Sequence, residues 1–218
     1  MHSLNHDLPE PVVYVIDDDA DVRRSLTWLL DSVQLPVQSF ASALEFLESP
    51  LLDAPACIVL DIRMRGMSGL QLQSHLQQQG CAIPIIFMTG HGDIAMSVQA
   101  MRAGAFDFLE KPFHPQQMLN QIQNCLQHAE AIYRAQRTQQ QQQQKLQSLS
   151  PREREIMALL VEGYASKVIA QKLNISHKTV EIHRAHIRQK LGTESIAHLV
   201  NLALSCNSTP LQLHKFSY

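Results

Sequence analysis

The chain has 218 residues, of which 45% are hydrophobic, so it is long and apolar enough to bury one large core or two small ones. Its net charge of −2 hides an asymmetry, because residues 1–130 carry 15 acidic and 6 basic side chains whereas residues 131–218 carry 5 and 12. This composition excludes a disordered chain, and no stretch approaches the roughly 18–20 apolar residues of a membrane span. We expect two units, the second of which meets a polyanion.

The cysteines, the histidines and the first residues indicate the compartment. Four cysteines are widely spaced without a C-x-x-C pair, so neither a zinc site nor a disulfide framework is expected. The histidines show no spacing typical of metal ligands. The opening residues, MHSLNHDLPEP, lack the basic region and apolar core of a secretion signal. We therefore expect a protein of the reducing cytoplasm that has no membrane partner.

In the first part of the chain, short β-branched runs alternate with helical patterns. Five strands that are each followed by a helix predict an α/β unit with a five-stranded, doubly wound parallel sheet. The strands are expected near residues 12–16, 36–40, 56–60, 84–88 and 106–109.

A glutamine-rich run, RAQRTQQQQQQKLQ at residues 134–147, marks the end of this unit. Only Ala135 and Leu146 are apolar in it, so it cannot bury a face. Glutamine is a good helix former, and neither glycine nor proline interrupts the run. We therefore expect the preceding helix to continue as a polar rod or a coiled-coil stalk. The predicted organisation is a first domain over 11–130, a helical linker over 131–147 and a second domain over 148–207.

The second part shows helical patterns without a strand signal. Ser150 and Glu153 have the spacing of a capping box at the start of the first helix, and the second helix is expected to bury Val168, Ile169 and Leu173. Asn174 suits a left-handed turn and Ser176 an N-cap, so two helices across a short turn predict a helix-turn-helix. The four helices of this all-α domain are expected near 151–162, 166–173, 177–191 and 195–205.

Polar side chains stand where four of the predicted strands end. The first strand ends in Asp17 and Asp18, the third in Asp61 and the fourth in Thr89, while Lys111 follows the fifth by two residues. Because the carboxyl ends of parallel strands meet at one edge, these groups should lie close together. The repulsion among three carboxylates is compensated if a divalent cation, of which Mg²⁺ is the natural candidate, binds them. The hydroxyl and the ammonium group then suit a phosphoryl group.

Four motifs, VIDDD, VLDIRMRGMSG, FMTGHGD and FLEKPF, resemble the receiver domain of two-component response regulators over residues 11–130. The resemblance implies a flavodoxin-like receiver fold in which Asp61 accepts a phosphoryl group. It also implies an Mg²⁺ site in which Asp18 is a direct ligand beside Asp61, Asp17 acts through water and the backbone carbonyl of Arg63 adds a ligand.

By the same resemblance, Thr89 and Lys111 hold the phosphoryl oxygens and Phe108 occupies the aromatic switch position. Phosphorylation of Asp61 is expected to draw Thr89 toward it and to turn Phe108 inward. This should change the face made by residues 94–126, where such domains commonly dimerise. The alternative for Phe108 is an ordinary core residue.

Three further residues around this site are interpreted separately. Asp19 and Asp93 are expected to act as helix caps or turn formers. Arg65 stands where the family usually has proline, so it restores an N–H group and brings a cation near the site. The alternative is that the side chain of Arg65 faces solvent and does nothing.

The third helix of the second domain has two faces. An apolar stripe of Val180, Ile187 and Leu191 is spaced to face a core. The opposite face has basic residues at both ends, which suits phosphates, and shorter side chains between them, which suit base edges in the major groove. The residues assigned to DNA contact are Lys178, Thr179, Glu181, Ile182, Ala185 and Arg188.

The stretch LSPREREIMALLVEGYASKVIAQKLNISHKTVEIHRAHIRQKL resembles the LuxR-type helix-turn-helix, and both domains together resemble the FixJ and NarL group of transcription factors. The continuous linker is similar to that of FixJ-like members. Glu181 departs from the frequent lysine or arginine at its position, so the resemblance gives no base preference.

This group membership implies a phosphorylation-dependent transcriptional regulator. It would not be an enzyme, although it would take part in its own phosphorylation and dephosphorylation. The resemblance favours an activator. The implied partners are a sensor histidine kinase, promoter DNA, a second copy on phosphorylation and, as a candidate, RNA polymerase.

Two other functions remain open from the residues. The D-x-D pattern within DDDAD also occurs in haloacid-dehalogenase-like phosphatases, whose nucleophile would be Asp17. Phosphate on Asp61 rather than on Asp17 would distinguish the two. A module that only binds and dimerises without phosphate is the second alternative, but its expected sign, loss of an acid, the threonine or the lysine from the site, is absent from the sequence.

Overall fold

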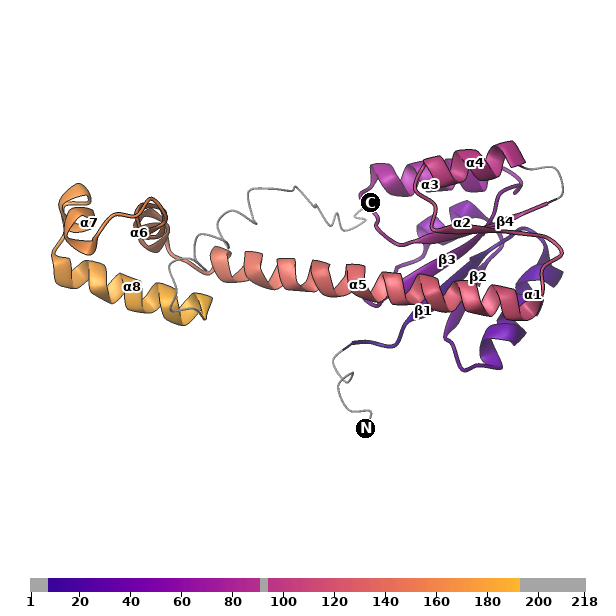
Figure 1. Ribbon diagram of the computed structural model, residues 1–218, viewed down its shortest axis with the longest axis horizontal. Helices are drawn as coiled ribbons and strands as arrows, with labels where there is room; N and C mark the ends of the chain where they lie inside the picture. The colour runs from indigo at the N-terminus through magenta and orange to yellow at the C-terminus, as the bar shows by residue number, and fades with distance from the viewer. Residues whose placement is uncertain (1–7, 91–93, 193–218) are drawn as a thin grey trace. The chain divides into compact units, whose positions relative to one another are not determined.

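The computed structural model describes residues 8–90 and 94–192 (Figure 1). It divides into two compact units, and the division falls after Arg134, inside a long helix. The expected fourth helix at 195–205, the end of the predicted second domain and Asp93 lie outside the described residues.

The first unit contains the predicted five-stranded sheet. All pairings are parallel, and the strand order is β2-β1-β3-β4-β5. The central strands β1 and β3 are buried along their whole length, as their continuous apolar runs require. Four of the strands differ from their expected bounds by one residue at one or both ends. The strands are β1 (Val12–Ile16), β2 (Val37–Phe40), β3 (Ala56–Asp61), β4 (Ile85–Thr89) and β5 (Asp107–Glu110).

Helices cover both faces of this sheet, which confirms the doubly wound fold (Figure 1). Side chains alternate along each strand, so Tyr14 packs into the core beneath α2, α3 and α4, whereas Val13 packs beneath α1 and α5. The helices are α1 (Ala20–Asp31), α2 (Ala43–Glu48), α3 (Gly69–Gln78), α4 (Ile94–Arg102) and α5 (Pro115–Gln147).

Local contacts fix the loops that follow β1 and β3. Asp19 caps α1 as expected, because its side chain accepts a hydrogen bond from the backbone N–H of Asp21 at 2.8 Å. Gly69, the first residue of α3, lies against the end of β3. A Cβ atom there would stand 2.3 Å from the carbonyl oxygen of Asp61, so only glycine allows this close approach.

Helix α5 runs through the glutamine-rich segment, as the sequence predicts. Its last buried residue is Tyr133, and none of residues 134–147 is buried. Among the described residues, no helix is both long and apolar enough to cross a bilayer.

The second unit contains α6 (Pro151–Val161), α7 (Ser166–Lys172) and α8 (His177–Leu191), close to their expected bounds. Ser150 and Glu153 form the predicted capping box. Asn174 adopts the left-handed conformation with φ of 52°, and Ser176 caps α8 through the N–H of Thr179. The expected burial of Val168 is wrong, because α7 has only about two turns and packs the neighbouring Ile169 into the core, which leaves Val168 on the surface.

Candidate functional site

Lys111 joins the ends of two strands in the first unit. Its Nζ atom lies 2.7 Å from Oδ2 of Asp17, which follows β1, and 2.6 Å from Oδ1 of Asp61, the last residue of β3. Asp17 is 1% exposed and Asp61 7%. The structure thus brings together three of the predicted strand-end groups, which are far apart in the sequence, in one buried cluster.

The second oxygen of each carboxylate is held by the adjacent backbone. Oδ1 of Asp17 accepts a hydrogen bond from the N–H of Asp19, and Oδ2 of Asp61 accepts one from the N–H of Arg63, both at 2.8 Å. The guanidinium group of Arg23 donates to the carbonyl oxygen of Asp17 at 2.7 Å. The orientation of both carboxylates is therefore set by the loops that follow β1 and β3.

Burial and charge act against each other in this cluster. Burial raises the pKa of Asp61 above its usual value, and Lys111 only partly counteracts this shift. Burial by itself lowers the pKa of Lys111, but hydrogen bonds to Asp17 and Asp61 outweigh it, so the pKa of Lys111 is raised. The ammonium group therefore stays charged at neutral pH, while two carboxylates compete for it.

Asp18 and Arg65 lie at the outer rim of the cluster. Oδ2 of Asp18 accepts a hydrogen bond from the N–H of Arg65 at 3.3 Å and lies 3.7 Å from its Nε atom. The N–H group that a proline would lack is therefore used, while the Arg65 side chain is 98% exposed. Together with Met64 and Met96, these residues line an open cavity of about 580 Å³.

Thr89 and Phe108 lie on neighbouring strands but in different surroundings. Thr89 ends β4 and is 3% exposed. Phe108 on β5 pairs in register with Phe87 and is 43% exposed, so its interpretation as a core residue is wrong.

The charges of this cluster fit a divalent cation. Three carboxylates, Asp17, Asp18 and Asp61, stand at these strand ends, and within the described part of the chain Lys111 is the one ammonium group that pairs with Asp17 and Asp61, which leaves an excess of negative charge. Carboxylate and carbonyl oxygens are the ligands that Mg²⁺ prefers in proteins. Arg63, whose backbone carbonyl is the further expected ligand, follows Asp61 by two positions in the chain. The residues present are therefore suited to the metal expected from the sequence.

Helix α8 of the second unit has the two faces that its sequence predicts. Val180, Ile187 and Leu191 are at most 2% exposed. The residues assigned to DNA contact lie on the other side, where all but one are exposed. The exception is Thr179, which is half-buried and forms a hydrogen bond with Ser176. The exposed ones are Lys178, Glu181, Ile182, Ala185 and Arg188.

Arg184 is a neighbour of this face that the sequence interpretation did not include. Its guanidinium group donates to the hydroxyl of Ser166 on α7 and lies 3.4 Å from Oε1 of Glu181. A hydrogen bond with Ser166, aided by the charge of Arg184, lowers the pKa of Glu181. The i, i+3 spacing of Glu181 and Arg184 is the signal that could have indicated this pair.

Two family models match the chain, one to each unit. The model of the response regulator receiver domain matches residues 13–123, and that of bacterial regulatory proteins of the luxR family matches residues 147–203.

Similar proteins extend over most of the chain. The transcriptional regulatory protein TdiR of Thauera aromatica is 44% identical over 90% of this chain and 86% of its own. The transcriptional regulatory protein FixJ of Bradyrhizobium diazoefficiens is 40% identical over 88% of this chain and 94% of its own. Among solved structures, the response regulator StyR has a TM-score of 0.80 at 44% identity and covers 90% of this chain and 99% of its own. Full-length FixJ from B. japonicum has a TM-score of 0.54 at 40% identity and covers 91% of this chain and 98% of its own.

Proposed function

The chain belongs to the response regulators that join a receiver domain to a LuxR-type DNA-binding domain, and we propose that phosphorylation of Asp61 controls its regulation of transcription. The phosphoryl donor is a sensor histidine kinase. The observation that carries this proposal is the contact of Lys111 with both Asp17 and Asp61, since it places one cation between the strand ends.

Asp61 has the surroundings that a phosphoacceptor needs. An oxygen of its carboxylate forms a bond to phosphorus while the bond from phosphorus to the donor's imidazole nitrogen breaks, and the electron pair of that bond leaves with the imidazole. Lys111 supports the reaction by neutralising negative charge on the phosphoryl oxygens. Thr89 is the hydroxyl that holds one of these oxygens afterwards. No general base is required, because a carboxylate has no proton to lose when it is ionised.

Asp17, Asp18, Asp61 and the backbone carbonyl of Arg63 are proposed to hold Mg²⁺. When it is bound, this ion adds positive charge where the phosphoryl oxygens gather negative charge. This assignment is supported by the pairing of two carboxylates, Asp17 and Asp61, with the single ammonium group of Lys111.

The response to phosphorylation is proposed to pass through Thr89 and Phe108. Phe108 is 43% exposed, so its ring is not packed in the core, and it is proposed to turn inward when Thr89 moves toward phosphorylated Asp61. Val98 and Met101 on α4 are also exposed, so the face of residues 94–126 offers apolar side chains to a second copy of the chain. We propose that this face forms a homodimer on phosphorylation.

The dimer is proposed to bind promoter DNA through α8 in the cytoplasm. Lys178 and Arg188 would contact phosphates, while Glu181, Ile182 and Ala185 between them would reach base edges. Two copies on a two-fold axis would occupy half-sites about 10 bp apart, centre to centre. The resemblance to FixJ-like regulators favours an activator, with RNA polymerase as a further partner.

Phosphate mapping tests this function against its alternatives. The full chain is incubated with acetyl phosphate and MgCl₂, and the modified residue is identified by peptide mass analysis after reductive trapping of the acyl phosphate. We expect one phosphate on Asp61, and a dimer that forms only after treatment. Phosphate on Asp17 with turnover of a phosphomonoester would identify a phosphatase instead. A chain that stays unlabelled and dimerises regardless would be a binding module.

A further inference from the structure

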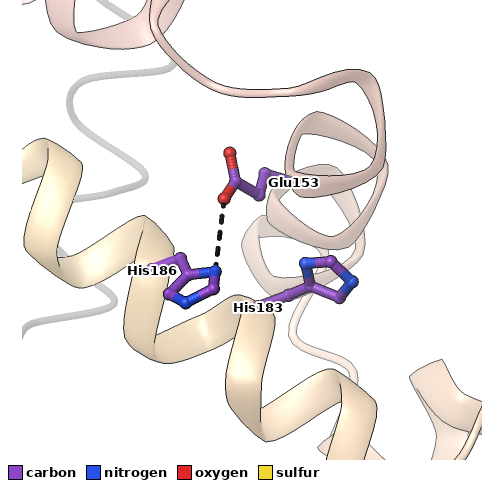
Figure 2. Close-up of side chains that lie close together, drawn as sticks. All are labelled: Glu153, His183 and His186. Carbon is purple, nitrogen blue, oxygen red and sulfur yellow. Dashed lines mark ion pairs between the residues drawn. The ribbon is translucent and has the colours of Figure 1, made fainter.

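A cluster of possible metal ligands lies in the second unit, and none of its residues belongs to the set assigned to DNA contact. It consists of Glu153 on α6 and of His183 and His186, which stand three residues apart on α8 (Figure 2). One ligand atom of each residue lies within 4.8 Å of one ligand atom of the other two. The sequence predicts no such site, because the carboxylate lies on another helix, 30 residues before His183.

The two oxygens of Glu153 have different surroundings. Oε2 accepts hydrogen bonds from the N–H of Ser150 at 2.8 Å and from Nζ of Lys190 at 2.7 Å. Oε1 faces the histidines and lies 3.8 Å from Nδ1 of His186 (Figure 2). Glu153 is 3% exposed, and its bonds to Lys190 and Ser150 lower its pKa to about 2. The carboxylate is therefore ionised, and the bonds on Oε2 hold Oε1 in position.

His183 brings a nitrogen that lacks a partner. Its Nδ1 atom is buried and forms no hydrogen bond within the described part of the chain. A buried nitrogen of this kind is uncommon and indicates that a water molecule or an ion completes its surroundings. His186, by contrast, has a side chain that is 54% exposed, so its ring can rotate and an ion can enter from solvent.

We propose that Glu153, His183 and His186 bind a divalent transition-metal ion of the zinc type and thereby join α6 to α8. Two imidazoles and one carboxylate form a set of ligands that suits zinc, with a fourth position left for water. Ligands 2.0–2.1 Å from a tetrahedral ion are about 3.4 Å apart, so the present atoms, which lie within 4.8 Å of one another, need to approach by about 1.4 Å at most. Imidazole ligands select zinc, nickel or copper over Mg²⁺.

The site has a consequence for the helix assigned to DNA contact. None of its three residues belongs to that contact set, so metal and DNA do not compete for the same side chains. The ion would fix α8 against α6 by bonds that do not depend on Lys190, and it would bring two positive charges next to α8. This inference does not rest on the phosphorylation of Asp61.

Zinc titration of the full chain tests the site. The protein is stripped with a chelator and kept in excess MgCl₂, which occupies carboxylate sites elsewhere in the chain, and Zn²⁺ binding is followed by competition with a chromogenic chelator. We expect His183→Gln and His186→Gln each to weaken the tightest Zn²⁺ binding at least tenfold. His177→Gln, on the same helix but outside the cluster, is the matched control and should leave this binding unchanged. Glu153 is not substituted because it also caps α6.

A second measurement separates ligation from folding. Zn²⁺ should raise the midpoint of thermal unfolding of the parent chain and of His177→Gln, but not of His186→Gln. Because His186 is on the surface, we expect His186→Gln to leave the fold intact. This variant therefore tests metal ligation even where His183→Gln is less stable than the parent. Equal Zn²⁺ affinity of His186→Gln and the parent would overturn the proposal, as would an equal loss in His177→Gln.

Discussion

Two buried carboxylates, one in each unit, have similar partners but opposite pKa shifts. Asp61 is 7% exposed and Glu153 3%, and each lies within 2.7 Å of a lysine ammonium group, Lys111 or Lys190. Burial raises the pKa of Asp61, whereas the bond to Lys190 and the N–H of Ser150 lower the pKa of Glu153 to about 2.

Sharing of the lysine distinguishes the two carboxylates. Each accepts a hydrogen bond from one backbone N–H, Asp61 from Arg63 and Glu153 from Ser150. Asp61 shares Lys111 with Asp17, so two buried negative charges depend on one cation, whereas no other carboxylate of the described residues pairs with Lys190. The first arrangement costs stability and leaves a carboxylate ready for chemistry, while the second stabilises the fold. Variants that remove one charge at a time test this contrast.

The largest effect is expected for Asp61→Asn, which should abolish phosphorylation by acetyl phosphate. In Mg²⁺-free buffer its free energy of unfolding should rise, because one of the two carboxylates that share Lys111 loses its charge. Mass analysis measures the first effect and urea unfolding the second. Asp31→Asn, an exposed change in the same unit, should alter neither. Labelling at the parent rate would exclude Asp61 as the acceptor. A lower free energy of unfolding of Asp61→Asn than of the parent would contradict the view that repulsion between Asp17 and Asp61 destabilises the fold.

Lys111→Ala should have the opposite effect on stability. It leaves Asp17 and Asp61 facing each other without a cation, so the Mg²⁺-free protein should lose about 3 kcal/mol. Mg²⁺ should still bind, but dimerisation after phosphorylation should be at least about tenfold weaker because the phosphoryl oxygens lack their cation. Sedimentation with and without acetyl phosphate measures this. Arg24→Ala is the exposed control, and dimerisation as strong as in the parent would show that Lys111 has no such role.

For Glu153→Gln we expect a loss of stability of about 1–3 kcal/mol near neutral pH. Because the pKa of Glu153 is lowered on folding, its contribution is present above the unfolded-state pKa of about 4.5 and is lost as pH falls toward about 2. The stability difference between parent and variant should therefore shrink over that range. Urea unfolding with hydrogen exchange of α6 amides, in the presence of a chelator, measures it.

Glu155→Gln provides the control for this substitution on the same helix. Glu155 pairs with Arg152 at 2.6 Å, but its side chain is 54% exposed, so its loss should cost less than about 0.5 kcal/mol. A loss as large as that of Glu153→Gln, or a difference from the parent that does not change with pH, would show that Glu153 is not the stabilising charge that its contacts indicate.

The sequence predicted residue proximity best where the topology of a parallel sheet determines which residues come together. Parallel strands end at one edge, so the proximity of Asp17, Asp61 and Lys111 could be predicted without knowing any contact. Val168 was misplaced because burial in a short helix depends on how it packs, which periodicity over two turns does not determine. The contacts of Glu153 with α8 depend on the packing of two helices, and no pattern along the chain encodes them.

The smallest expected effect concerns Glu181, a carboxylate that is neither buried nor paired with a lysine in the described structure. Its pKa is lowered by a hydrogen bond with Ser166 and by nearby Arg184, so it stays ionised and can accept from a cytosine amino group. Glu181→Ala should leave folding unchanged and relax the preference at one base pair of each half-site by about 1 kcal/mol.

Binding-site selection with Glu181→Ala and Lys178→Ala separates base reading from phosphate contact. Lys178→Ala should weaken binding to all sequences alike and lower the salt slope by about one unit, because it removes one phosphate contact. Glu181→Ala should instead change the selected motif and slightly raise nonspecific affinity, because a negative charge near the phosphates is lost. If the motif changes with Lys178→Ala and not with Glu181→Ala, α8 enters the groove in another orientation, and Glu181 serves only to position Arg184.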